Sequence, residues 1–123
     1  MSMSVKKFND IINRFWSKEG RNTIWHTGYC SEVAVAFDTF LNGQGKIGKQ
    51  GWFHTIYIYK EKYCDIRGCM SEAQLDFHNP IGSEGQPRPA TPSELHHIYS
   101  LLNKKRTQYV IRGLKKAQQE LRK

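Results

Sequence analysis

The most constraining feature of the chain is a change of hydrophobic period within residues 28–68. After Cys30, small and apolar side chains recur at the spacing of a helix that buries one face. Residues 52–59 then read WFHTIYIY, an aromatic and β-branched run that is typical of a strand. This order predicts an α+β fold in which the helix packs on a small antiparallel sheet.

A tight turn at Lys60 and Glu61 predicts that residues 63–67 return as a second strand. A two-residue loop places Asp65 opposite Ile56, one diagonal step from His54 on the same face. Such neighbours lie about 7–8 Å apart at Cα, which side chains can span with a hydrogen bond. A three-residue loop would turn Asp65 to the other face.

Cys30, His54 and Asp65 follow one another in the order nucleophile, base and orienting group. The N-terminal turn of a helix favours an anion, so a thiol at this position is more readily ionised. A histidine can then act as the base, and a carboxylate can fix its tautomer. Singly, each residue also has a structural interpretation: a core thiol, a packed ring and a strand-ending carboxylate. Together they predict a catalytic triad.

The three residues resemble the core of the papain-like clan of cysteine hydrolases, in its compact bacterial and phage forms. The matching segments are GYCSEVA, WFHTIYIY and YCDIRG. Papain-like toxin domains, transglutaminase-like proteins and NlpC-type peptidases are similar. The resemblance implies a cysteine-dependent hydrolase or deamidase that acts on a protein or peptide amide and needs no cofactor. Peptidase, deamidase and acyl transferase stay open.

Three positions depart from the patterns of this clan. The glycine that follows Cys-Ser in NlpC-type enzymes is Glu32, and the Cys-to-His interval is only 24 residues. The glutamine that papain enzymes place six residues before the cysteine is Ile24. Other side chains must therefore complete the oxyanion site and the cleft. The polar and aromatic candidates are Asn22, Trp25, His26 and Trp52; alternatively, Trp25 fills the core and His26 faces water.

The remaining segments predict one domain of 123 residues with a helix at each end. Residues 4–18 carry apolar side chains on one helical face, and Ser4 is a natural cap. Residues 42–51 are rich in glycine and read as a loop without a nucleotide-binding pattern. Residues 77–89 predict an irregular connection, and a capping box at residues 91–94 begins a helix over about 92–122, with a break near 113.

Positive charge gathers in this last helix. The chain carries a net charge of +8, and residues 93–123 hold eight basic and two acidic side chains. The alternative function is therefore a small basic phage or plasmid protein that binds or inhibits nucleic acid or a host protein that processes it. A solvated helix end explains the charge equally simply, and residues from 113 onward are then dispensable for folding. The candidate binding residues are Lys104, Lys105, Arg106, Arg112, Lys115 and Lys116.

Several other classes of protein are excluded. No apolar run is long enough to span a membrane, and the N-terminus lacks the apolar segment of a signal peptide, which predicts a cytoplasmic protein. Three cysteines do not form a disulfide framework. Cys64, Cys69 and His78 lack a fourth ligand for zinc, so no metal site is predicted.

Overall fold

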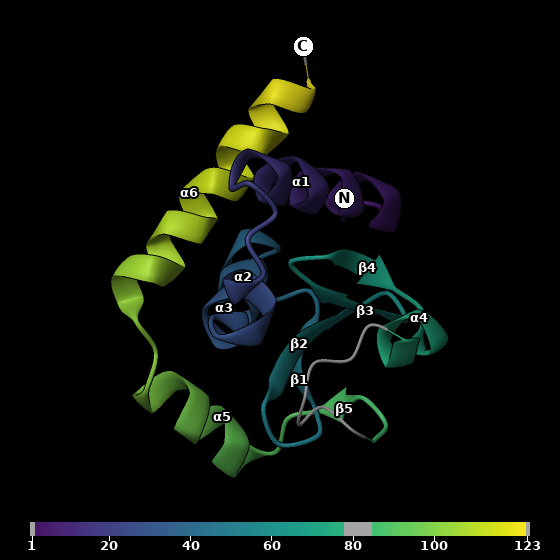
Figure 1. Ribbon diagram of the computed structural model, residues 1–123, viewed down its shortest axis with the longest axis vertical. Helices are drawn as coiled ribbons and strands as arrows, with labels where there is room; N and C mark the ends of the chain where they lie inside the picture. Colours follow the sequence, from purple (N-terminus) through teal and green to yellow (C-terminus); the bar gives the residue numbers. More distant parts are fainter. Residues whose placement is uncertain (1, 78–84, 123) are drawn as a thin grey trace.

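The computed structural model describes residues 2–77 and 85–122. The chain forms a mixed α+β fold around a five-stranded antiparallel sheet of order β4-β3-β2-β1-β5 (Figure 1). The elements are α1 (Val5–Lys18), α2 (Ile24–Thr27), α3 (Cys30–Phe40), β1 (Lys46–Gln50), β2 (His54–Tyr59), β3 (Lys62–Asp65), β4 (Gly68–Met70), α4 (Glu72–Phe77), β5 (Arg88–Pro89), α5 (Pro92–Ser100) and α6 (Lys104–Leu121).

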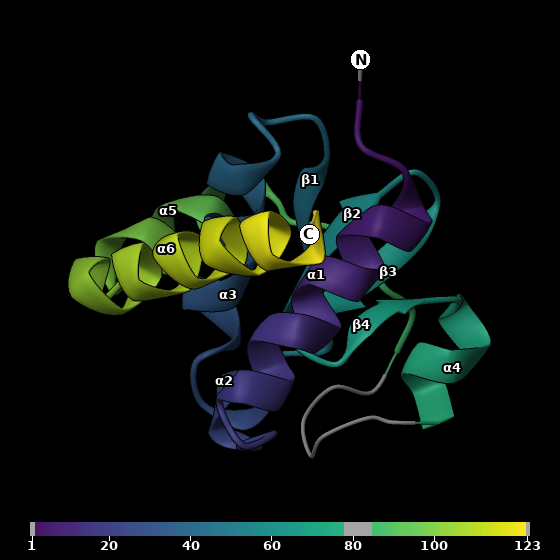
Figure 2. The same ribbon diagram turned by 90° about the horizontal axis from the view of Figure 1, so that it is seen from above.

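Helices cover both faces of the sheet. On one face the Phe8 ring from α1 meets Phe37 of α3 and Tyr59 of β2 at centroid distances of 5.0 and 5.6 Å. The long helix α6 packs against both α1 and α3 and forms the outer layer (Figure 2). On the opposite face a smaller cluster joins Ile56 and Leu75, which brings α4 against the sheet. The main core therefore lies between the sheet, α3, α1 and α6.

The first helix forms as its sequence predicts. Ser4 caps α1 by accepting a hydrogen bond from the backbone N–H of Lys7 at 3.1 Å. The buried face of the helix comprises Phe8, Ile11, Ile12 and Phe15. Burial of such a face, more than helix propensity, stabilises a helix of this length.

The β2–β3 hairpin has the two-residue loop that fixes its register. Tyr59 pairs with Lys62, so Lys60 and Glu61 alone make the turn, with φ angles of 48° and 66°. Positive φ at both central residues suits the right-handed twist of the flanking strands. The paired register continues to Tyr57 and Cys64, and β3 ends at Asp65. This register sets Asp65 on the face predicted for it.

Half of the predicted glycine-rich loop is a strand. β1 occupies Lys46–Gln50 and pairs with both β2 and β5. The prediction was wrong because glycine was taken as a loop signal, whereas here it permits close packing. A Cβ atom on Gly48 would lie 2.6 Å from the carbonyl oxygen of Arg88, and one on Gly45 would lie 2.4 Å from that of Ile58.

The predicted helix over residues 92–122 is two helices, and the break is not at Gly113. α5 ends at Ser100, and α6 begins after Asn103, whose side chain accepts a hydrogen bond from the N–H of Arg106. Thr91 and Glu94 form the predicted capping box of α5. Gly113 instead lets α6 approach α1, because a Cβ atom there would lie 2.2 Å from Phe15 Cε1.

The second half of α6 belongs to the core, so it is not dispensable for folding. Leu114 is fully buried and Arg112 is exposed. Leu114→Ala is expected to lower the free energy of unfolding by about 2–5 kcal/mol, since it removes buried methyl groups and leaves a cavity. Arg112→Ala, on the exposed face of the same helix, is expected to change the free energy of unfolding by less than about 0.5 kcal/mol. Urea unfolding of both variants measures the difference; equal stabilities would contradict this packing.

Candidate active site

Cys30 is the first residue of α3 and is only 7% exposed. Its Sγ lies 3.4 Å from the carbonyl oxygen of Phe53, and the N–H of Thr55 donates a hydrogen bond to Sγ at 3.4 Å. The thiol therefore lies against the backbone on both sides of His54. The position at the start of a helix of eleven residues adds the positive end of the helix dipole.

His54 and Asp65 form a buried pair. His54 Nε2 lies 2.9 Å from Asp65 Oδ2, and both side chains are 1% exposed. A carboxylate can only accept, so Nε2 carries the proton of this hydrogen bond. Nδ1 of His54 is buried and has no hydrogen-bond partner among the described residues. In the neutral ring Nδ1 is then the basic nitrogen, which is the one needed to take a proton from a thiol.

Arg67 fixes the carboxylate from the other side. Its backbone N–H donates to Asp65 Oδ1 at 2.8 Å, and its Nη2 donates to Oδ2 at 2.5 Å. Burial alone raises the pKa of Asp65, but the hydrogen bonds from His54 and Arg67 outweigh it and lower this pKa to about 2. Asp65 is therefore ionised at neutral pH. A buried carboxylate of this kind is stable only because its lone pairs are occupied by charged or polar donors.

The thiol and the imidazole shift one another toward their charged forms. Burial raises the pKa of Cys30, but the contact with His54 and the hydrogen bond from the Thr55 N–H lower it below its ordinary value overall. Burial lowers the pKa of His54, but the hydrogen bond with Asp65 and the contact with Cys30 raise it overall. Both shifts favour a thiolate–imidazolium pair, the reactive form of a cysteine nucleophile.

Three more polar side chains adjoin the thiol. The hydroxyl groups of Ser31 and Thr55 are hydrogen-bonded at 2.9 Å, and Lys49 Nζ donates to Thr55 Oγ1 at 3.3 Å. Ser31 comes from the first turn of α3, while Lys49 and Thr55 face one another across β1 and β2. A cation and two hydroxyl groups thus flank the nucleophile on the side away from Asp65, which is held by Arg67.

A pocket of about 400 Å³ is lined by Tyr29 and Ser31, the two chain neighbours of Cys30, and by Phe53, the residue before His54. Its walls come from the start of α3, the β1–β2 turn, and the α5 and α6 ends. Trp52 is 84% exposed and Phe53 is also exposed, so two aromatic rings stand at the rim. The polar and aromatic residues of the lining include Tyr29, Ser31, Lys49, Trp52, Phe53 and Arg106.

The four predicted cleft residues have different positions. Trp52 lines the pocket. The Asn22 side chain accepts a hydrogen bond from the N–H of Ile24 at the start of α2. Trp25 is buried in the core and stacks on the partly exposed ring of Tyr109 at a centroid distance of 6.0 Å, and His26 packs edge-on against Trp16 at 6.2 Å. Asn22, Trp25 and His26 therefore do not contribute to the lining of this pocket.

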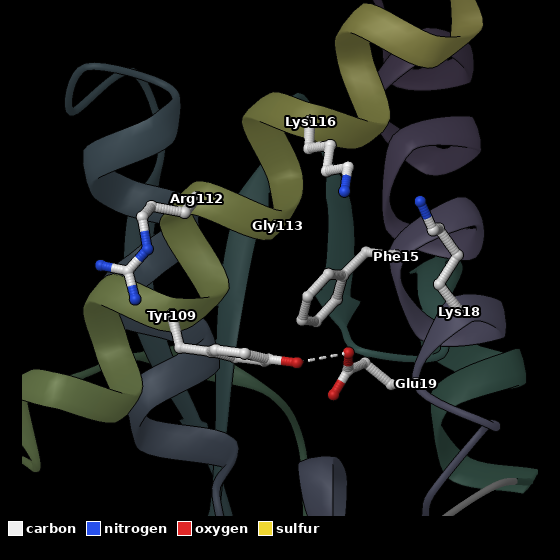
Figure 3. A pocket seen from close by; sticks show the side chains of 7 residues that line it. All are labelled: Phe15, Lys18, Glu19, Tyr109, Arg112, Gly113 and Lys116. Carbon is white, nitrogen blue, oxygen red and sulfur yellow. Dashed lines mark hydrogen bonds between the residues drawn. The ribbon is translucent and has the colours of Figure 1, made fainter.

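The six basic residues of the C-terminal segment are divided between two places. The Arg106 guanidinium stacks 3.7 Å from the centroid of the Tyr29 ring and pairs with Glu32 at 3.4 Å, which brings it to the pocket beside the thiol. The others are exposed on the outer side of α6: Lys104, Lys105, Arg112, Lys115 and Lys116. Figure 3 shows Arg112 and Lys116 around a shallow pocket of about 320 Å³ between α1 and α6, over Phe15 and Tyr109.

Sequence reasoning missed Arg67, Lys49, Ser31 and Thr55. Arg67 had a local signal, since a carboxylate followed two residues later by a cation in a turn can close on itself. Ser31 and Thr55 adjoin two predicted triad residues, so they were within reach of the same argument. Lys49 had no such signal, because its strand was read as a loop and its partner across the sheet was then unknown.

The remaining site candidates are the three residues considered as zinc ligands. Cys64 and Cys69 are paired across β3 and β4 with their sulfur atoms 3.0 Å apart, and His78 lies outside the described residues. Residues 2–77 and 85–122 contain no group of three or more side chains arranged to hold a metal ion. Within the same ranges, every helix is too short or too polar to cross a bilayer.

Comparisons with known proteins give no relatives: no family model, curated protein or solved structure matches the chain. The function is therefore inferred from the geometry of the site and from the sequence resemblance alone.

The buried carboxylate predicts a dependence of stability on acid. Its pKa is about 2 in the folded protein against an ordinary 3.8, so its contribution is present above about pH 4 and is lost as the pH falls toward 2. The stability advantage of wild type over Asp65→Asn is expected to shrink by about 2 kcal/mol across this window. Urea unfolding at a series of pH values measures it.

The partly exposed carboxylate Asp10, whose side chain is 47% exposed, supplies the control. Asp10→Asn is expected to stay within about 0.5 kcal/mol of wild type throughout the same pH series. A difference between wild type and Asp65→Asn that does not vary with pH would mean that Asp65 is not held as a carboxylate.

Proposed function

We propose that this protein is a cysteine-dependent amide hydrolase or deamidase with a Cys30-His54-Asp65 triad. One observation carries the proposal: a buried His54–Asp65 pair at 2.9 Å adjoins a thiol at the start of a helix. The opposite pKa shifts of Cys30 and His54 support it, because they favour the thiolate–imidazolium form.

The reaction follows from the proposed roles. The Cys30 thiolate attacks the carbonyl carbon of an amide and forms a tetrahedral intermediate. The first backbone hydrogen bond of α3 runs from Val33 N–H to the carbonyl oxygen of Tyr29. The N–H groups of the helix before Val33 have no partner within the helix, so they can donate to the oxyanion and stabilise it. His54 protonates the leaving amine, or ammonia in a deamidation. Water, deprotonated by His54, then hydrolyses the thioester and restores the thiol.

The proposal includes a papain-like core. It is supported by the order of the elements, since the thiol opens α3, the imidazole begins β2 and the carboxylate ends the adjacent β3. Each of these positions is the one that the resemblance implies. A protein or peptide amide substrate and a cytoplasmic location belong to the same proposal. No cofactor is required by the steps above.

A second candidate function is a basic binding protein without turnover. It is favoured by the exposed cations on the outer side of α6, which lie on the far side of that helix from its buried residues. A surface of this kind can bind nucleic acid or an acidic protein that processes it. The two functions predict different behaviour of Cys30 and of the cations.

Alkylation tests the triad. At mildly acidic pH, iodoacetamide is expected to modify Cys30 before Cys64, because the hydrogen bond with Cys69 and burial raise the Cys64 pKa well above its ordinary value. His54→Ala removes the base and the cation that stabilises the thiolate, so the Cys30 pKa rises and alkylation slows roughly tenfold. Asp65→Asn is expected to lower turnover strongly with less effect on alkylation.

His96 provides a matched control, because it is exposed on α5. Its replacement by alanine is expected to leave the pH profile of alkylation unchanged. Mass spectrometry of the Cys30 peptide against pH, alongside thermal melts, gives the comparison. Identical profiles in wild type and in folded His54→Ala and Asp65→Asn proteins would reject the triad and favour the binding protein.

The proposed enzyme is not expected to bind DNA or RNA. Fluorescence anisotropy with labelled duplex DNA and single-stranded RNA at low salt measures this, since binding by cations falls steeply with added salt. An affinity that is lost at higher salt and abolished by the double change Lys115→Glu, Lys116→Glu would support the second candidate instead. Both lysines are exposed, so these changes test charge and not folding.

A further inference from the structure

Lys49 is buried, and no carboxylate of residues 2–77 or 85–122 forms an ion pair with it. It lies on β1 between β2 and β5, lines the pocket and is 9% exposed. The polar partner of its ammonium group within residues 2–77 and 85–122 is a hydroxyl group, Thr55 Oγ1 at 3.3 Å. Lysines are almost never buried this deeply unless they are paired. A buried ammonium group is stabilised when an anion lies against it.

Two carboxylates of the described residues that are near Lys49 or line the same pocket are already engaged. Glu94 is held by Arg88 through two hydrogen bonds of 2.6 and 2.8 Å. Glu32 at the pocket pairs with Arg106, which also stacks on Tyr29. Neither carboxylate forms an ion pair with Lys49. Burial lowers the pKa of Lys49, and the charges of Cys30 and Glu94 oppose this shift only in part. An anion that enters the pocket from solvent would stabilise the ammonium form further.

The donors around this lysine fit a carboxylate. An ammonium group has three protons, and one is used on Thr55. Ser31 and Thr55 together carry two hydroxyl protons, and their mutual hydrogen bond uses one. Two ammonium protons and one hydroxyl proton remain for an acceptor. A carboxylate offers acceptors only, and the first turn of the eleven-residue helix α3 adds a favourable dipole.

The subsite lies next to the nucleophile. Ser31 follows Cys30 directly, and the N–H of Thr55 donates to Cys30 Sγ. Lys49, Ser31 and the exposed ring of Trp52 line one pocket. A substrate whose amide carbonyl meets the thiol can therefore place a nearby carboxylate on Lys49 while its apolar part contacts the aromatic rim.

We propose that Lys49 and Ser31, positioned by the buried hydroxyl group of Thr55, form a carboxylate-binding subsite, and that the substrates are amides bearing a carboxylate close to the reacting carbonyl group. The inference rests on the proposed function and deepens it, because it names the substrate class of the same site. Acidic side chains or a chain-terminal carboxylate supply this chemistry in a peptide.

Two alkylating reagents of the same size test the subsite directly. Iodoacetate and iodoacetamide carry the same reactive carbon, and only iodoacetate carries a carboxylate. The measured quantity is the iodoacetate rate divided by the iodoacetamide rate for Cys30. It is normalised to the same ratio for glutathione, which corrects for the intrinsic reactivity of the reagents. In wild type this normalised ratio is expected to exceed one. Lys49→Gln is expected to lower this ratio about tenfold, because one cation at close range is removed. Lys49→Arg keeps the charge and is expected to retain the preference.

Lys46 gives the matched control, since it is an exposed lysine on the same strand. Lys46→Gln makes the same chemical change and is expected to leave the ratio within about twofold of wild type. Succinate is expected to protect Cys30 from iodoacetamide in wild type and not in Lys49→Gln. Thermal melts confirm that each variant is folded.

The outcomes separate this inference from the function beneath it. Slow alkylation of Cys30 by both reagents in wild type would contradict the proposed cysteine-dependent function, and the subsite proposal would fail with it. Fast iodoacetamide reaction with an unchanged ratio in Lys49→Gln would overturn the subsite alone. Equal slowing of both reagents in Lys49→Gln would also overturn it, because Lys49 would then stabilise the thiolate and not a bound carboxylate.

Discussion

The buried contact between His54 and Asp65 is the constraint on which the rest of the site depends. Two groups that water would solvate lie 2.9 Å apart with 1% of each side chain exposed. Removing one partner of such a pair costs about 3–5 kcal/mol, because the other stays buried without compensation. Arg67 offsets this cost by binding both carboxylate oxygens. The effect of the pair on the site is to raise the pKa of the imidazole against the opposing effect of burial.

Two local features of the fold bring the thiol to this pair. The two-residue turn at Lys60 and Glu61 fixes the strand register, and a slip by one residue would turn Asp65 to the other face. The apolar face of α3, including Phe37, is anchored in the main core and holds the first residue of that helix against β2. The packing of α3 in the main core, at a distance from the site, therefore positions Cys30. The β2–β3 hairpin positions His54 and Asp65.

The α+β fold and the positions of Cys30, His54 and Asp65 could be predicted where one local pattern was sufficient. The Ser4 cap, the Thr91–Glu94 capping box and the aromatic strand from His54 each carry their own signal. Glycines misled the prediction twice, because Gly48 and Gly113 serve close packing between elements that the sequence does not show to be neighbours. Lys49 was missed for the same reason. Its proposed role depends on Thr55 of the neighbouring strand and on Ser31 at the start of α3, and the sequence does not show that these residues are neighbours.

The most direct test of this account is an NMR titration of the His54 ring in wild type and in Cys30→Ser. A thiolate that contacts the imidazolium holds the second ring proton, so the wild-type ring is predicted to stay doubly protonated above its ordinary pKa of 6.5. In Cys30→Ser that pKa is predicted to fall, although the hydrogen bond with Asp65 remains. Identical titration curves in the two proteins would contradict the account, because His54 would then be coupled to Asp65 alone and not to a nucleophile.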